Sequence, residues 1–304
     1  MKLPIIKNEE VCLPLLQDKG VSLFVKREDT IHTYISGNKY RKLKYNVLEA
    51  FRLKKCCLLT FGGAYSNHIA AVAAAGKIYG FSTVGVIRGQ ELGDKTDNNP
   101  TLRYARDCGM HLEFVSREAY RRKNDPDFQK ELLTRFDNCY LIPEGGTNSL
   151  AVKGCEEIVT GKDAEFDYIT ACVGTGGTLA GLINSSKENQ KVLGFPALKG
   201  DFLKEDIRKF ASKENWQLIK GYEYGGYARV TRELISGMNA FYAETGILTD
   251  PVYTGKMIMG VLDLLKKGYF KKGSRILAIH TGGLQGIAGM NVKLEQSNMP
   301  LINI

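Results

Sequence analysis

The chain has 304 residues, of which 43% are hydrophobic and 25% are charged, and its formal net charge is +9. This length suits two packed lobes or one large α/β domain, and the composition is that of an ordinary globular protein. No apolar run approaches the length of a membrane span, and acidic residues interrupt the N-terminal apolar stretch, so we expect a cytoplasmic protein without a membrane partner.

Short β-branched runs alternate with helical patterns along the chain, which predicts βα units and mainly parallel sheets. Because no low-complexity linker or repeat divides the sequence, two lobes would share chain crossings. The expected strands are 21–28, 56–62, 82–89, 111–116, 139–143, 167–173, 216–223 and 274–282, and the expected helices are 39–55, 66–80, 96–109, 231–244 and 255–268.

Cysteine, histidine and basic residues are scattered rather than clustered. The seven cysteines form no CxxC array, so we expect small buried hydrophobes rather than a zinc site or disulfide framework, and four dispersed histidines give no support for a metal. The basic residues carry no nucleic-acid-binding signature, and an anionic cofactor with a carboxylate substrate explains the positive charge as well. We therefore expect no nucleic-acid partner.

A glycine-rich turn, GTGGTLAG (174–181), follows the apolar run DYITACV and precedes a helical pattern. Backbone N–H groups at such a helix start favour an anion, and Gly174, Gly176 and Gly177 let the backbone approach a phosphate, while Thr175 and Thr178 can donate hydroxyl hydrogen bonds. The turn is neither a dinucleotide GxGxxG nor a nucleotide P-loop, so a single phosphomonoester fits best. The alternative is a tight turn without a ligand.

Two further segments place polar groups at helix starts. In SGNKYRKLKY (36–45), Lys39 follows a Ser-Gly-Asn turn, where the positive end of the helix dipole should lower its pKa and suit an imine-forming amine. In TFGGAYSNHIAA (60–71), Ser66 is a good N-cap that could also bind a substrate carboxylate with the following amides. The alternatives are a solvated lysine and a purely structural cap, and His68 is more often structural than a general base.

DPVYTGKM (250–257) and AIHTGGLQG (278–286) each carry threonine beside glycine. Either could be a strand end with a turn. Taken together and in this order, VKREDT with SGNKYRKL, FGGAYSNH, GTGGTLAG, LTDPVYTGK and IHTGG resemble the 1-aminocyclopropane-1-carboxylate (ACC) deaminase/D-cysteine desulfhydrase family. That family belongs to the tryptophan-synthase-β-like, fold type II enzymes that use pyridoxal 5′-phosphate (PLP), and the resemblance spans roughly residues 21–290.

The resemblance implies an α/β fold of two lobes, each an open, mainly parallel sheet flanked by helices. It implies a larger PLP-binding domain of residues 1–43 and 151–304 and a smaller inserted domain of 44–150. It also implies a homodimer. For the matched residues it implies a Schiff base at Lys39, a cofactor 3′-oxygen contact from Asn67, a substrate carboxylate site at Ser66, a phosphate cradle at Gly174–Thr178, and substrate-facing Tyr253 and Tyr227. Tyr222 and Tyr224 are open alternatives to Tyr227.

The family comparison also bears on the reaction. This chain has Thr254 and Thr281 where ACC deaminases resemble DPVYEGK and HLGG, and D-cysteine desulfhydrases have threonine at both sites. A hydroxyl beside the pyridine nitrogen would leave it largely neutral, which suits β-elimination, whereas ACC has no α-hydrogen and its ring demands more of the cofactor. We expect elimination from a small amino acid such as D-cysteine, giving pyruvate, ammonia and sulfide. ACC deamination to 2-oxobutyrate, another amino-acid lyase and a non-catalytic PLP binder are the alternatives.

Overall fold

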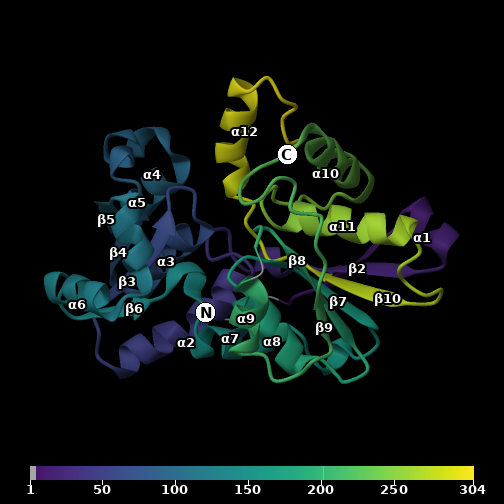
Figure 1. Ribbon diagram of the computed structural model, residues 1–304, viewed down its shortest axis with the longest axis horizontal. Coiled ribbons are helices and arrows are strands. Elements are labelled where there is room, and N and C mark those ends of the chain that lie inside the picture. The colour runs from purple at the N-terminus through teal and green to yellow at the C-terminus, as the bar shows by residue number, and fades with distance from the viewer. Residues whose placement is uncertain (1–4, 201) are drawn as a thin grey trace.

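The computed structural model describes residues 5–200 and 202–304, which form two β-sheets flanked by helices (Figure 1). The six-stranded sheet has the order β1-β2-β10-β7-β8-β9, and all neighbours are parallel except β1 and β2. Its strands are β1 (Asn8–Val11), β2 (Ser22–Lys26), β7 (Tyr168–Val173), β8 (Lys191–Pro196), β9 (Trp216–Leu218) and β10 (Arg275–Ile279).

The four-stranded sheet has the order β5-β4-β3-β6 and is parallel throughout. Its strands are β3 (Cys57–Gly63), β4 (Ser82–Arg88), β5 (Met110–Val115) and β6 (Cys139–Ile142). Buried apolar runs such as β7 fit sheets covered on both faces. The α-helices are α1 (Pro14–Lys19), α2 (Asn38–Arg52), α3 (Asn67–Tyr79), α4 (Pro100–Asp107), α5 (Arg117–Arg121), α6 (Pro126–Arg135), α7 (Ser149–Glu156), α8 (Gly177–Ser185), α9 (Phe202–Arg208), α10 (Arg232–Thr245), α11 (Thr254–Lys266) and α12 (Gly286–Gln296).

Helices α2, α7 and α8 pack side by side at the junction of the two sheets (Figure 1). Glycines allow this close approach. A Cβ atom on Gly154 of α7 would lie 1.9 Å from the Arg41 carbonyl oxygen of α2, and one on Gly181 of α8 would lie 2.5 Å from the Cys155 side chain of α7. Because any larger side chain would separate these helices, the two glycines fix how close the start of α2 lies to the start of α8.

The α/β class and the mainly parallel sheets are confirmed, and the differences concern short elements. Strands β1 and β8 were not predicted, and β9 covers only Trp216–Leu218 of the expected 216–223. The expected helix 96–109 begins only at Pro100, after a 3₁₀ segment (Gln90–Asn98), because Asn99 caps α4 through Thr101 and Leu102.

The cysteine prediction was wrong for four residues. Cys57 and Cys139 occupy paired positions on the neighbouring strands β3 and β6 and form a disulfide. Cys12 and Cys56 are exposed, whereas Cys155 and Cys172 are buried as expected. Sequence spacing could not reveal the disulfide, because strand pairing across a sequence separation of 82 brings the two thiols together.

Every strand of the four-stranded sheet falls between residues 57 and 142, and the strands of the six-stranded sheet lie outside that range. The domain boundaries at 43/44 and 150/151 stay a prediction, since α2 begins before the first and bonds to residues on both sides of the second. Over the described part of the chain, the helices are too short or too polar to cross a bilayer.

A buried ion pair anchors α2 to the segment that follows β2. The guanidinium group of Arg41 donates two hydrogen bonds, each 2.9 Å, to the carboxylate of fully buried Glu28. A second carboxylate, that of Glu157, lies 3.5 Å away. The bidentate contact between Glu28 and Arg41 therefore joins the motifs KRED and GNKYRK. Arg41 lies two positions beyond Lys39.

We predict that Glu28→Gln lowers the free energy of unfolding by about 3 kcal/mol, because it leaves the buried Arg41 charge with only the Glu157 contact. Glu49→Gln, which breaks the solvent-exposed pair with Arg52 on the same helix, should change it little. Denaturant unfolding of both variants measures the difference. Equal effects would contradict an anchoring role for the buried pair.

Candidate active site

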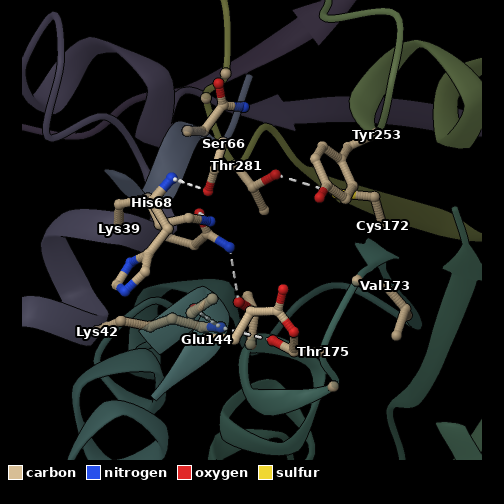
Figure 2. Close-up of a pocket in the computed structure, with 18 of the residues that line it drawn as sticks. Lys39, Lys42, Ser66, His68, Glu144, Cys172, Val173, Thr175, Tyr253 and Thr281 are labelled. Carbon is tan, nitrogen blue, oxygen red and sulfur yellow. Dashed lines mark hydrogen bonds between the residues drawn. The ribbon is translucent and has the colours of Figure 1, made fainter. Parts of the chain in front are cut away.

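A cavity of about 340 Å³ lies where the two sheets meet, and side chains from both reach it. Figure 2 shows Lys39 and Lys42 on one side of this cavity and Tyr253 on the other. Its size is that of a small-molecule site. The wall includes these residues predicted from the sequence: Lys39, Ser66, Asn67, Gly174, Thr175, Gly176, Thr178, Tyr227, Tyr253 and Thr281. Gly177, at the start of α8, directly follows the lining residue Gly176.

Lys39 lies in the first turn of α2, and its Nζ donates a 3.0 Å hydrogen bond to the Asn38 Oδ1. Burial lowers the pKa of the Lys39 ammonium group. The direction agrees with the sequence analysis, which attributed it to the helix dipole, but removal from water is the principal cause. A lysine amine with a lowered pKa is a better nucleophile near neutral pH.

The turn before Lys39 packs directly on the end of β10. Gly37 has φ 54°, and a Cβ atom there would lie 2.2 Å from the Thr281 carbonyl oxygen. The Asn38 amide donates to that same oxygen at 3.3 Å. Glycine is therefore required at position 37 for both its conformation and its closeness to Thr281.

The glycine-rich turn joins β7 to α8, and Gly176 has φ 82° at the helix N-cap. Two side chains from α2 reach this turn. The Asn38 Nδ2 donates to the Thr178 Oγ1 at 2.8 Å, and the Lys42 Nζ lies 3.3 Å from the Thr175 Oγ1. The start of α2 and the start of α8 are thus joined on both sides of Lys39.

Lys42 is a site residue that the sequence analysis missed. It is buried, and its Nζ donates 2.9 Å hydrogen bonds to the Gly145 carbonyl oxygen and the Thr147 Oγ1. Among residues 5–200 and 202–304, no carboxylate forms an ion pair with it. Burial and the nearby Lys39 charge lower its pKa to about 7. Its spacing of three from Lys39, which places both on one helix face, was the available signal.

Ser66 and Asn67 open α3 on another part of the wall. The Ser66 Oγ accepts from the amides of His68 (3.2 Å) and Ile69 (3.4 Å), so its predicted capping role is confirmed. The Asn67 Oδ1 accepts from the Gln285 Nε2 at 3.1 Å, which joins α3 to the segment after β10.

His68 is buried, with its Nε2 2.8 Å from the Thr60 Oγ1. Burial, with the Lys39 and Lys42 charges, holds its pKa well below the usual value. The imidazole is therefore neutral, which supports a structural position.

Tyr253 and Tyr227 contact each other edge to face, with ring centroids 6.2 Å apart. The Asp250 carboxylate orients the first of them, because it accepts hydrogen bonds from the amides of Tyr253 (3.1 Å) and Thr254 (2.7 Å). Burial raises the pKa of Tyr253 well above its usual value, so its hydroxyl stays protonated. Tyr222 instead bonds Asp263 outside this cavity.

The two threonines singled out from the sequence occupy different places. Thr281 lines the cavity, and its Oγ1 lies 3.1 Å from the Cys172 Sγ. Thr254 is fully buried and is absent from the cavity wall, because its hydroxyl donates to the Asp250 carboxylate at 2.8 Å. Its hydroxyl is thus engaged at the start of α11, and the cofactor contact of Thr254 stays a prediction.

Two charged residues on the wall were also missed. Arg88 ends β4, and Glu144 accepts a 2.6 Å hydrogen bond from the Tyr120 hydroxyl. Neither belongs to a recognisable motif, so only the fold brings them to the cavity. Across the described residues, no cluster of three or more His, Cys, Asp or Glu side chains is arranged to hold a metal ion.

The wall fits PLP on three counts. A buried amine at Lys39 can bond an aldehyde, the glycine-rich backbone at Gly174–Gly176 lines the cavity and suits a phosphate, and the Lys42 amine, which has no carboxylate partner among the described residues, favours an anion beside that backbone. A phosphate dianion there would supply the missing counter-charge.

Comparison with known proteins supports this fit. The family model for pyridoxal-phosphate dependent enzymes matches residues 8–282. A Pyrococcus furiosus protein, named as a candidate ACC deaminase, is 32% identical across 88% of this chain and 86% of its own length. The Rhizobium rhizogenes ACC deaminase is 30% identical across 88% and 89%. The mitochondrial bifunctional D-cysteine desulfhydrase/ACC deaminase of Arabidopsis thaliana is 30% identical across 88% and 74%.

Solved structures agree in fold. The crystal structure of an ACC deaminase homologue superimposes with a TM-score of 0.80 at 27% identity and covers 97% of this chain and 95% of that one. An O-acetylserine dependent cystathionine β-synthase from Helicobacter pylori has a TM-score of 0.65 at 16% identity, which shows the fold alone. The chain therefore belongs to the fold type II, PLP-dependent enzymes, in the family of the ACC deaminases and D-cysteine desulfhydrases, and acts as an amino-acid lyase or deaminase.

Proposed function

We propose that this enzyme eliminates a β-substituent and ammonia from a small amino acid of the D-cysteine type, giving pyruvate, ammonia and sulfide. One observation carries the proposal: Asn38 and Lys42, on both sides of Lys39, bond to Thr178 and Thr175 of the glycine-rich turn. A single small molecule can therefore touch the amine and the turn together.

The residues proposed to hold PLP surround that junction. Lys39 would bond the aldehyde carbon, and the amides of Gly174–Gly177, with the hydroxyls of Thr175 and Thr178, would bind the phosphate beside Lys42. Asn67 and Thr281 would contact the ring. When bound, PLP supplies an electron-withdrawing ring that makes the α-hydrogen of an attached amino acid acidic.

The protein's own residues would then handle the substrate. Displaced from the cofactor, the Lys39 amine can accept the α-proton, because burial lowers its pKa and favours the neutral base. The Ser66 hydroxyl can donate to the substrate carboxylate while its oxygen still caps α3. Tyr253 and Tyr227 would face the leaving group, and the Tyr253 hydroxyl, being protonated, is available as a donor.

Two observations bear on the choice between D-cysteine and ACC. Thr281 presents a hydroxyl, not a carboxylate, to the cavity, which favours elimination over ring opening. The names of several relatives favour ACC deamination, which is therefore the second candidate, while the Arabidopsis thaliana relative is named for both activities. The cytoplasmic location and the homodimer stay predictions.

We predict that Lys39→Ala abolishes turnover together with the borohydride-stable bond between protein and PLP, because no other amine on the wall replaces Lys39 at its position. Lys77→Ala, an exposed lysine of α3, serves as the matched control and should retain both. Keto-acid release and mass spectrometry of reduced peptides measure the two properties. A Lys39→Ala protein that keeps both would contradict the assignment.

For the substrate, we predict that purified enzyme forms pyruvate from D-cysteine at least about tenfold faster than 2-oxobutyrate from ACC, a factor equivalent to about 1.4 kcal/mol in activation free energy. Thr281→Ser keeps the hydroxyl and should preserve this ratio. A keto-acid assay with both substrates decides the matter, and comparable rates from ACC would overturn the preference.

Phosphate binding should depend on pH through Lys42. Its pKa of about 7 means that the amine is largely neutral above that pH, so binding a phosphate dianion must take up a proton, and affinity should fall by up to about tenfold per pH unit between pH 8 and 9. Pyridoxine 5′-phosphate, which lacks the aldehyde, isolates this effect from bonding to Lys39.

Titration calorimetry of the unliganded protein tests this dependence. Lys42→Met should bind pyridoxine 5′-phosphate about 10-fold or more weakly at pH 7 and lose most of the pH slope. Lys44→Gln, whose amine pairs with Glu157 instead, should retain the slope. An unchanged slope in Lys42→Met would show that another group takes up the proton.

A further inference from the structure

Tyr227 lies on a connection between β9 and α10 that adopts an unusual backbone conformation. Tyr224 (φ 47°), Gly225 (φ 91°), Gly226 (φ 110°) and Ala228 (φ 54°) all have positive φ, and two of these are not glycine. Such conformations are disfavoured for residues with a Cβ atom and persist only where surrounding contacts impose them. Tyr227 itself is 44% exposed, so burial of its ring does not by itself hold the connection in place.

One buried lysine supplies the missing contacts. Lys256 of α11 is 1% exposed, and its Nζ donates to the carbonyl oxygens of Glu223 (2.7 Å) and Gly226 (2.8 Å). Within the described residues, no carboxylate pairs with this amine; the Glu223 carboxylate accepts instead from the Gly221 amide at 3.1 Å. A buried amine that serves two backbone carbonyls is costly and so indicates a specific structural purpose.

The other wall tyrosine directly precedes the same helix. Tyr253 is the N-cap residue of α11, three positions before Lys256, and Asp250 holds this start of the helix through the Tyr253 and Thr254 amides. The Gly226 carbonyl that Lys256 binds immediately precedes Tyr227, and the Tyr227 ring contacts Tyr253. Lys256 therefore connects α11 to the backbone next to Tyr227 through a hydrogen bond.

We propose that Lys256 is a positioning residue for the substrate pocket: its two hydrogen bonds to the Glu223 and Gly226 carbonyls hold the 223–228 connection so that Tyr227 stays against Tyr253. Lys256 does not line the cavity and touches no reacting group. The effect on catalysis rests on the proposed function, since it requires Tyr227 to face the substrate. The effect on the connection does not.

Hydrogen exchange tests the structural part without any activity. In Lys256→Met, which keeps the length of the side chain but loses its donors, the hydrogen-bonded amides of Gly226 and Arg229 should exchange at least about tenfold faster than in the native protein. Lys266→Met, an exposed lysine on the same helix, should leave them unchanged. Unchanged exchange in Lys256→Met would overturn the proposal, whatever the enzyme's reaction.

Kinetics tests the connection to Tyr227. Lys256→Met should retain the PLP spectrum but lose about tenfold or more in kcat/KM, and Tyr227→Ala combined with Lys256→Met should be no worse than Tyr227→Ala alone. If the two losses in kcat/KM multiply in the double variant, Lys256 acts through general stability, and the proposal is overturned. Lys256→Gln, which restores a donor, should recover part of the loss and replaces Lys256→Met if that variant fails to fold. A native enzyme without keto-acid release would overturn only the proposed function.

Discussion

The site depends on how closely α2, α7 and α8 approach one another. Gly154 and Gly181 remove the side chains that would hold these helices apart, so the lysine-bearing start of α2 meets the glycine-rich start of α8. Asn38 and Lys42 then join the two helix starts by hydrogen bonds. A close-packed contact of this kind tolerates little displacement, which gives the cavity a fixed span between an amine and an anion site.

The pKa shifts of the two lysines explain which kind of molecule suits this span. Lys39 and Lys42 bring two amines into one buried region, and burial lowers the pKa of both. A lowered pKa favours the neutral amine at Lys39, which can react with an aldehyde. A phosphate beside Lys42 would stabilise the charged form of that lysine. The desolvation that makes two buried amines costly therefore favours a cofactor with an aldehyde at one end and a dianion at the other.

Much of the candidate site could be predicted from the sequence, because short motifs identify the polar residues and glycines at the start of a helix. The roles of Ser66 as a cap and of the 174–178 turn as a strand-to-helix connection followed from local rules. Arg88 and Glu144 did not, since their importance depends on which elements pack together, and for Lys42 the only local signal was its spacing of three from Lys39. For Thr254, the motif locates the residue beside Tyr253, but only the structure shows its hydroxyl bound to Asp250, and its contact with the cofactor stays a prediction.

The most direct measurement is a crystal structure of the enzyme with PLP bound. The account predicts a covalent bond from the Lys39 Nζ to the cofactor, with the phosphate oxygens within hydrogen-bond reach of the Gly174–Gly177 amides and the Lys42 Nζ. A phosphate bound away from that turn, or a cofactor bonded to another lysine, would contradict it.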